Sequence, residues 1–428
     1  MCDLLLLDLP RGVRDYPPAQ AIAIKNIIGV IEEVYKRFGF YPLETPAMEM
    51  KGVLNAKAYG EDSAKELFCI EGEDAGLRYD FTVPLARYVA SNKDISLPFK
   101  RYQIGTMWRK EEPQRMRYRE AIQADVDIVG SAEVGSDAEV IAANALAMEE
   151  LGLRNYNILI NSRVLLQNIL AYFKVPAEKQ TQAVRILDKL QKLSSEEAIR
   201  QLADIGVDER TAEEMLNFVR QEADNDELLE RLSASVEGIK EEVAKMQELL
   251  GLLKEYRLSG RIRIDLALAR GLNYYTGFVW EFIVEENGKR LPSIGGGGRF
   301  DKLIGVYAKK DIPAVGSSIG ISRLFDLVAA KDGIKTYAKV LIAYLGVQNR
   351  GYAINAATML RGNGVYVDLN VTSRNLSKQL EYAGSLRIPH VMIIGDQERE
   401  ANKVKIRNMI NGEEELITLQ EAIEKLKE

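Results

Sequence analysis

The chain has 428 residues, of which 46% are hydrophobic and 28% are charged, and its formal net charge is −6. This length exceeds one ordinary hydrophobic core, so we expect two or three domains of a soluble globular protein. The net negative charge argues against a non-specific coat on nucleic acid, but it allows a local basic groove, because binding follows the distribution of charge.

Cysteine and histidine are scarce: the chain carries Cys2, Cys69 and a single histidine, His390. These residues cannot build a zinc cluster or a disulfide framework, which fits a reducing cytoplasm. Mechanisms that need a catalytic histidine or a histidine-ligated metal are therefore disfavoured. The apolar run 4–7 is too short for a signal or membrane segment. We expect a cytoplasmic protein with no metal site of its own and no membrane contact.

The first predicted element is an amphipathic helix over residues 21–38, where apolar residues recur at helical spacing and Gly39 follows. Residues 40–46 contain two prolines and are expected to be extended, because proline disfavours helix in the residue before it. A helix followed by an extended segment is thus predicted for 21–46.

Residues 77–90 combine a short strand with the start of a helix. On a strand, Asp80 and Thr82 would point the same way and offer two oxygen acceptors to an ammonium group. Capping of the helix N-terminus by either side chain fits the same spacing equally well.

Residues 99–130 predict two strands joined by a long loop rich in arginine. The second strand, 121–129, alternates, so that Gln123, Asp125 and Asp127 share the polar face. Arginine is favoured where phosphates are gripped by paired hydrogen bonds, so the loop suggests a phosphate site, with a solvated loop as the alternative.

After a helix at 135–151 and a short strand at 156–160, residues 163–256 are helical throughout and read as an inserted helical domain. Within it, the segment 228–253 fits either a coiled segment or an ordinary bundle.

The next stretch is aromatic and then glycine-rich: RGLNYYTGFVWEF at 270–282, a hairpin turn at 286–289, and GGGGRFD at 295–301. Residues 278–284 have the composition of a strand. Four consecutive glycines form either a loose loop or a backbone that something approaches closely, such as a small flat ligand. The neighbouring Tyr274 and Tyr275 favour an aromatic ligand with polar edges.

Residues 314–328 predict a glycine-punctuated strand and a helix with Arg323 in its first turns. From residue 333 onward, strands and helices alternate, which predicts a compact α/β domain. The expected strands and helices are 339–345, 349–361, 365–371, 376–386, 390–394 and 403–408.

These stretches resemble a known family. Residues 99–130 and 314–328 look like the second and third motifs of class II aminoacyl-tRNA synthetases. RGLNYYTGFVWEF and GGGGRFD resemble the two signatures peculiar to histidyl-tRNA synthetases, and the last domain resembles the anticodon-binding domain that several of these enzymes share. The unit at 21–46 is similar to the family's first motif and dimer interface.

The resemblance implies an α+β fold with an antiparallel-sheet catalytic domain, formed by 1–162 and 257–332. A helical insertion at 163–256 and a C-terminal α/β anticodon-binding domain at 333–428 complete it. The implied activity has two steps: histidine and ATP, with Mg²⁺, give histidyl-adenylate, and histidine is then transferred to the 3′ end of tRNA(His). A cytoplasmic homodimer is expected.

The resemblance also implies residue roles. Arg270 and Arg109 would be catalytic. The remaining roles fall into three groups. ATP would be bound by Arg109, Glu111, Arg117 and Arg323. Histidine would be bound by Asp80, Thr82 and Gln123 at its amino group, by Asp127, Tyr274 and Tyr275 at its imidazole, and by Arg270 at its carboxylate. The tRNA, with its extra 5′ guanosine, would be read by Gln114 and Arg119.

Three positions depart from the family pattern: Asp127 replaces a common glutamate, Phe300 a tyrosine, and Ser322 an acidic residue. One rival interpretation is a non-catalytic paralogue that regulates histidine biosynthesis. Such proteins typically lack the tRNA-binding domain and lose signature arginines, whereas Arg109, Arg270 and Arg323 are present here. A class II synthetase for another amino acid is the second rival, and the RGLNYYTG element argues against it.

Overall fold

The computed structural model describes residues 7–55, 65–190, 193–220, 223–236, 238–270, 274–328, 333–372 and 374–427. The chain divides into two compact units, one of Met1–Arg14 with Asn26–Val328 and the other of Asp15–Lys25 with Ala329–Glu428. Within the described ranges, no helix is both long and apolar enough to cross a membrane.

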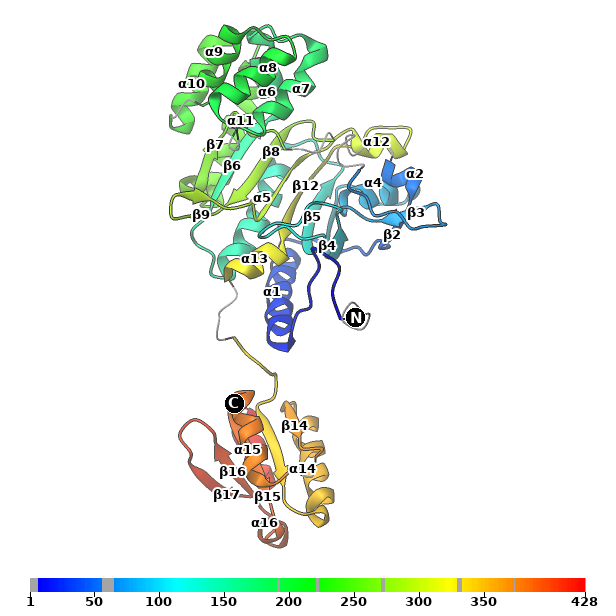
Figure 1. The fold of residues 1–428 in the computed structure, drawn as a ribbon, viewed down its shortest axis with the longest axis vertical. Coiled ribbons are helices and arrows are strands. Elements are labelled where there is room, and N and C mark those ends of the chain that lie inside the picture. The colour runs from blue at the N-terminus through cyan, green and yellow to red at the C-terminus, as the bar shows by residue number, and fades with distance from the viewer. Residues whose placement is uncertain are drawn as a thin grey trace, which may run out of the picture. The chain divides into compact units, whose positions relative to one another are not determined.

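The larger unit is built on one sheet with the strand order β1-β4-β5-β12-β11-β8-β6-β7 (Figure 1). The interior pairs, from β4 to β6, are antiparallel, whereas the edge strands β1 and β7 pair in parallel with their neighbours. The predicted antiparallel sheet is thereby confirmed. In sheet order, the strands are Tyr41–Pro42, Phe99–Trp108, Glu120–Val129, Ala314–Gly320, Gly295–Arg299, Phe278–Ile283, Asn157–Ser162 and Ile262–Ile264.

Helices pack on this sheet because their apolar faces need cover. The predicted first helix is α1, Pro18–Arg37, and Tyr35 within it is fully buried. The Tyr35 ring lies 5.8 Å from that of Tyr102 on β4, and its hydroxyl donates to Oδ1 of Asn144 at 2.7 Å. Asn144 belongs to α5, Val134–Glu150, which packs against β5 and β12.

Smaller elements complete this unit. They are the paired strands β2 (Met48–Met50) and β3 (Ala75–Leu77), and the helices α2 (Lys51–Asn55), α4 (Thr82–Ser91), α12 (Leu303–Tyr307) and α13 (Ile321–Val328).

The start of α4 corrects one expectation. Asp80 and Thr82 do not share a strand, because β3 ends at Leu77 and Thr82 is already helical. Instead, Oδ1 of Asp80 accepts a hydrogen bond from the backbone N–H of Val83 at 3.0 Å. A helix leaves the N–H groups of its first turn unpaired, and a short carboxylate there satisfies one of them. The predicted shared strand is therefore wrong, whereas the alternative, capping of the helix by Asp80, is confirmed for Oδ1.

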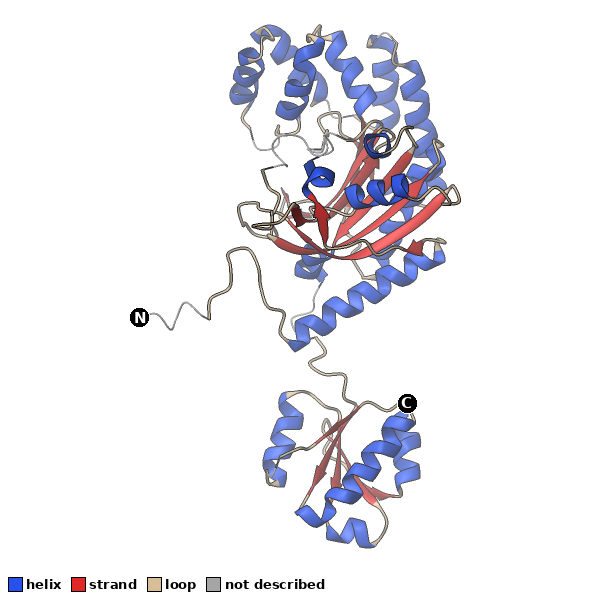
Figure 2. Ribbon diagram, turned by 90° about the vertical axis from the view of Figure 1, so that its right-hand side faces the viewer, coloured by secondary structure: helices blue, strands red, loops and turns tan. Residues whose placement is uncertain are grey.

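Between β6 and β7, the described residues form six α-helices and one short 3-10 helix, Ser259–Arg261; Figure 2 shows the α-helices as a blue group above the red sheet. They are α6 (Arg163–Tyr172), α7 (Ala177–Leu187), α8 (Ser195–Asp204), α9 (Glu209–Val219), α10 (Asn225–Ser235) and α11 (Lys240–Glu255). α11 packs along α5, which attaches the group to the sheet. Since residues 228–253 divide between α10 and α11, the ordinary bundle holds rather than one coiled segment.

The glycine run is a strand in the middle of the sheet, not a loose loop. β11 pairs with β8 on one side and with β12 on the other. The predicted hairpin ahead of it is confirmed: β9 (Glu285–Glu286) pairs with β10 (Lys289–Arg290). Its turn residues Asn287 and Gly288 have φ values of 53° and 73°, as a two-residue hairpin turn requires.

The smaller unit confirms the predicted α/β domain. Its sheet has the order β14-β13-β15-β16-β17, parallel at first and antiparallel from β15 onward. His390 begins β15, as predicted. The strands are β13 (Val340–Tyr344), β14 (Val367–Leu369), β15 (His390–Ile394), β16 (Val404–Asn408) and β17 (Glu414–Ile417). The main helices are α14 (Arg350–Gly362), α15 (Leu376–Ser385), α16 (Asp396–Glu400) and α17 (Leu419–Lys427).

Candidate active site

Two adjoining pockets open on one face of the catalytic sheet. The first is an open pocket of about 600 Å³, lined mainly from the loop after β4, from β5, from the start of β11 and the residues before it, and from α13. The second, of about 380 Å³, lies over β5, β11 and β12. Arg109, Gln123, Arg270 and Ser318 line both pockets, so the two form one continuous site.

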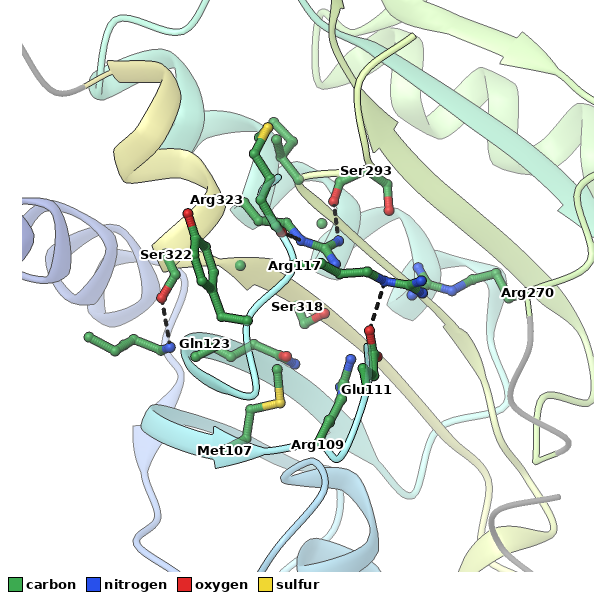
Figure 3. A pocket seen from close by; sticks show the side chains of 17 residues that line it. Met107, Arg109, Glu111, Arg117, Gln123, Arg270, Ser293, Ser318, Ser322 and Arg323 are labelled. Carbon is green, nitrogen blue, oxygen red and sulfur yellow. Dashed lines mark hydrogen bonds and ion pairs between the residues drawn. The ribbon is translucent and has the colours of Figure 1, made fainter. Parts of the chain in front are cut away.

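The first pocket is basic. Figure 3 shows three arginines directed into it: Arg109 and Arg117 from the loop after β4, and Arg323 from α13. Arg323 is held by two backbone carbonyls: its Nε donates to Met116 O at 2.8 Å and its Nη1 to Ser293 O at 2.7 Å. Arg323 is thus fixed by the fold and is not a plain surface arginine.

The charges in this pocket are unbalanced. Burial, together with repulsion from Arg109 and Arg117, lowers the pKa of Arg323 to about 10, although Glu111 opposes this. Glu111 is engaged with Arg117, whose Nε lies 2.7 Å from its Oε2. Guanidinium groups that repel one another gain most from a polyanion with several oxygens, such as a polyphosphate.

Arg109 lies where the two pockets meet. Its Nε donates to Tyr79 O at 3.1 Å, and its guanidinium carbon lies 4.4 Å from the centre of the Tyr79 ring. Burial opposes the charged form, but nearby Tyr79, Glu111 and Asp80 outweigh it and raise the pKa of Arg109. The group stays charged and oriented without a substrate.

Arg270 approaches the same junction from the opposite side. Its Nη1 donates to Trp280 O at 2.8 Å. This approach depends on glycine: a Cβ on Gly296 would overlap Nη1 of Arg270, and one on Gly298 would lie 2.6 Å from the Tyr275 ring. The backbone that something must approach closely is therefore β11, and the groups that approach it are Arg270 and Tyr275.

The second pocket is acidic and aromatic. The rings of Tyr274 and Tyr275 are tilted by 58° with 4.8 Å between their centres, and the Tyr274 hydroxyl donates to Oδ2 of Asp80 at 3.5 Å. Gly271, Leu272 and Asn273, the middle of the predicted signature, lie outside the described residues. An aromatic floor beside several carboxylates suits a ligand with a flat ring and basic nitrogens.

Two aspartates on β5 differ in their partners. Asp127 forms an ion pair with Arg101 of β4. Asp125 accepts a hydrogen bond from Nε2 of Gln123 at 2.6 Å. Burial, followed by repulsion from Asp127, raises the pKa of Asp125 to about 7. Burial also raises the pKa of Asp127, while Arg101 opposes the shift.

Arg101 and Asp125 were absent from the predicted site residues. The sequence pattern could have identified Asp125, because it shares the polar face of the predicted strand with Gln123 and Asp127. No sequence pattern could have identified Arg101, because nothing in the sequence shows that it lies opposite Asp127 in the β4–β5 register.

The two other departures from the family pattern have structural partners. Phe300 is buried, and its ring packs edge-on against that of Tyr274 at 5.9 Å. The Ser322 hydroxyl accepts a hydrogen bond from the Ile122 N–H at 3.0 Å, which ties α13 to β5.

The structure brings the residues expected to bind ATP and histidine into these two pockets. The residues expected to read tRNA lie apart from them. Gln114 is exposed in a tight turn with Arg117, and it lines a larger neighbouring cleft of about 1930 Å³. Arg119 bonds within its own loop, where Nε donates to Glu111 O at 2.9 Å.

Comparison with known proteins gives a consistent result. Residues 12–324 match the family model of histidyl-tRNA synthetase, and residues 339–428 match that of an anticodon binding domain. A histidine–tRNA ligase of Aeropyrum pernix is 36% identical over 426 residues, covering 97% of this chain and 96% of that protein. One of Clostridium tetani is 32% identical and covers 99% of both chains.

Solved structures agree. The crystal structure of histidyl-tRNA synthetase from Nostoc sp. PCC 7120 matches with a TM-score of 0.85 and 27% identity, covering 98% of this chain and 99% of that one. A Bacillus halodurans protein, described as an ATP phosphoribosyltransferase regulatory subunit/histidyl-tRNA synthetase, matches at 0.76 with 22% identity, which supports the fold alone. The chain belongs to the histidyl-tRNA synthetase family and is an aminoacyl-tRNA synthetase of class II fold with a C-terminal anticodon-binding domain.

Proposed function

We propose that this chain ligates histidine to tRNA(His) in two steps. The histidine carboxylate attacks the α-phosphorus of ATP, releasing pyrophosphate and leaving histidyl-adenylate. A hydroxyl of the terminal ribose of the tRNA then attacks the histidyl carbonyl and releases AMP. The observation that carries the proposal is the continuity of a basic pocket with an acidic, aromatic one, joined at Arg109 and Arg270.

Both attacking oxygens belong to substrates, so the protein needs no nucleophile of its own. Its contribution is alignment of the carboxylate with the phosphorus and neutralisation of charge on the phosphate oxygens. In this proposal, Arg109 grips the α-phosphate and Arg270 lies between that phosphate and the carboxylate. Their hydrogen bonds to Tyr79 O and Trp280 O support preorganisation of both guanidinium groups.

The remaining ATP contacts follow from the basic pocket. Arg117 and Arg323 bind the outer phosphates, and Glu111 accepts a hydrogen bond from the adenine amino group. Because Glu111 and Arg117 form an ion pair without ATP, binding would exchange that pair for two contacts with the nucleotide.

The histidine contacts follow from the acidic pocket. Asp80, Thr82 and Gln123 bind the α-amino group, and the imidazole lies against Tyr274 and Tyr275 with Asp127 as an acceptor. Asp127 forms an ion pair with Arg101, and this pair favours the ionised form of Asp127 against the effect of burial.

Magnesium enters this scheme as part of the substrate, MgATP. Among the described residues, no group of three or more His, Cys, Asp or Glu side chains is placed to hold a metal ion. The ion commonly keeps its waters and binds through substrate phosphates with one or two carboxylates.

The proposal extends to partners and domains. Gln114 and Arg119 read the acceptor end of tRNA(His). The C-terminal domain, residues 333–428, binds its anticodon. The helical segment, residues 163–256, is an insertion in the catalytic domain. The 21–46 unit forms the interface of a cytoplasmic homodimer. Tyr41 on the edge strand β1 is 68% exposed, which supports an unfilled apolar edge there.

The test is Arg270→Ala, with the two steps measured separately. A contact that strengthens in the transition state affects turnover more than binding. We expect histidine-dependent pyrophosphate exchange to fall by about 10²- to 10³-fold with little change in KM for ATP. Transfer from preformed histidyl-adenylate should suffer less. The exposed Arg263 on β7 is the control, since Arg263→Ala should leave both steps unchanged.

Equal losses in both steps of a folded Arg270→Ala variant would show that Arg270 only anchors the adjoining strand. Absence of any histidine-dependent exchange in the unaltered protein would favour the non-catalytic paralogue, and exchange with another amino acid would favour a different synthetase.

A further inference from the structure

Two side chains of the helical group bond to the backbone immediately before Arg270. Asp188 follows the last residue of α7, and its Oδ1 accepts a hydrogen bond from the Ala269 N–H at 3.2 Å. Arg163 begins α6, and its Nη1 donates to Ala269 O at 3.2 Å. Both backbone polar groups of Ala269 are therefore held by side chains of the inserted helices.

Arg270 itself has a backbone conformation that needs support. Its φ is 53°, in the left-handed region that side-chain-bearing residues seldom adopt. Such a conformation is strained and persists only where its surroundings fix it. The bonds to Ala269 supply such a constraint at the preceding residue.

The electrostatics of the three side chains agree with this geometry. Burial and repulsion from Glu281 raise the pKa of Asp188, while the N–H groups of Ala269 and Arg270 and the Arg270 charge oppose this shift. Burial lowers the pKa of Arg163, and Asp188 opposes that shift. Asp188 thus interacts with the charges of Arg163 and Arg270 and with the backbone at Ala269.

Neither Asp188 nor Arg163 lines the two substrate pockets. Asp188 lines the larger cleft beside the basic pocket, together with Arg117 and Arg323. Any effect of Asp188 on activation would therefore pass through another residue, and Arg270 is the one whose backbone it contacts.

We propose that Asp188 is a positioning residue, through which the helical insertion fixes the backbone of Arg270 and so sets the guanidinium for adenylate formation. Arg163 holds the other side of the same peptide. The inference rests on the catalytic role proposed for Arg270 and adds a function for the insertion in the activation step.

The test is a double-mutant cycle on the full-length protein, with Asp188→Ala, Arg270→Ala and the combination, read by histidine-dependent pyrophosphate exchange. Because small misplacements of a catalytic group are costly, we expect Asp188→Ala alone to lower kcat by roughly 10-fold or more, with KM for ATP little changed. In the Arg270→Ala background, the same substitution should have almost no further effect.

Asp208→Ala is the matched control. Asp208 also accepts a backbone hydrogen bond at a helix end of the insertion, from Thr211 N–H at 3.0 Å, but it does not contact Ala269. The Asp208→Ala substitution should lower the thermal stability of the insertion without changing kcat. Asp188→Asn keeps an oxygen acceptor for the Ala269 N–H and should retain most of kcat. If Asp188→Ala does not fold, the same cycle is run with Arg163→Ala, which removes the bond to Ala269 O.

Equal losses from the Asp188 substitution in both backgrounds would overturn the positioning role, as would an unchanged kcat in the single variant. If Arg270→Ala itself leaves exchange unchanged, the role proposed for Arg270 fails instead, and the two failures are distinguished within one experiment.

Discussion

Arg101 and Asp127 form a buried ion pair beneath the acidic pocket, with Nη2 and Oδ2 2.7 Å apart and side-chain exposures of 0% and 2%. The pair joins β4 to β5 in direct register. Removing one partner of such a pair leaves the other charge buried and uncompensated, which costs about 3–5 kcal/mol.

Arg101→Met should therefore lower the urea midpoint of unfolding of the catalytic domain markedly. The loss should be smaller at pH 5 than at pH 8, because protonation of Asp127 relieves the unpaired charge. Arg210→Met is the control: the Arg210–Glu214 pair is on the surface, with Arg210 88% exposed, and its removal should cost no more than about 0.5 kcal/mol. Equal midpoints for the two variants would contradict the prediction.

Asp125 should make stability depend on pH in a definite direction. Its pKa in the folded protein is raised to about 7, above the unfolded value, so the folded state binds the proton more tightly. The stability it contributes is present at pH 4 and is lost as pH rises to about 7. Asp125→Asn imitates the protonated form and should become more stable than the unaltered protein over this range, by on the order of 2–4 kcal/mol. A difference in unfolding free energy that does not change with pH would refute this.

Gly296→Ala should impair adenylate formation. A Cβ there would overlap Nη1 of Arg270 and Trp280 O, so either the guanidinium moves or β11 separates from β8. We expect pyrophosphate exchange to fall at least 10-fold, since one preorganised donor is displaced. Gly251→Ala in α11 is the control: nothing lies within 4 Å of its added Cβ, and it should stabilise the helix by about 0.5–1 kcal/mol. Full activity of folded Gly296→Ala would show that the close approach is dispensable.

Gln114→Ala should affect the tRNA step alone. The Gln114 side chain is exposed, and its backbone already closes the turn with Arg117. Loss of the amide should reduce the preference for tRNA(His) carrying the extra 5′ guanosine, with pyrophosphate exchange unchanged. Aminoacylation of tRNA with and without that base gives the measurement.

Arg119→Ala serves as the comparison for Gln114→Ala. It should also weaken the preference for the extra base, but it should slow activation in addition, because Nε of Arg119 supports the backbone of Glu111. Unchanged discrimination in both variants would remove the loop from tRNA recognition.

The sequence by itself determined most of the secondary structure, because helices, strands and turns depend on residues that lie close together in the chain. The helix over 21–38, the alternating strand over 121–129 and the hairpin at 286–289 depend on side-chain periodicity and turn residues within a few positions of one another. The same local patterns carried the resemblance to the synthetase motifs. They also gave the arginines of the basic pocket, since each arginine lies inside a recognisable motif.

Tertiary structure alone decided which groups meet. Composition left Gly295–Gly298 open between a loop and a closely approached backbone, and pairing with β8 and β12 settled it. Spacing left Asp80 open between a strand face and a helix cap, and the packing of α4 settled that. The Arg101–Asp127 pair and the Asp188–Ala269 bond each join residues that lie far apart in the sequence. No local pattern records such contacts, because they depend on strand register and on where the inserted helices return to the sheet.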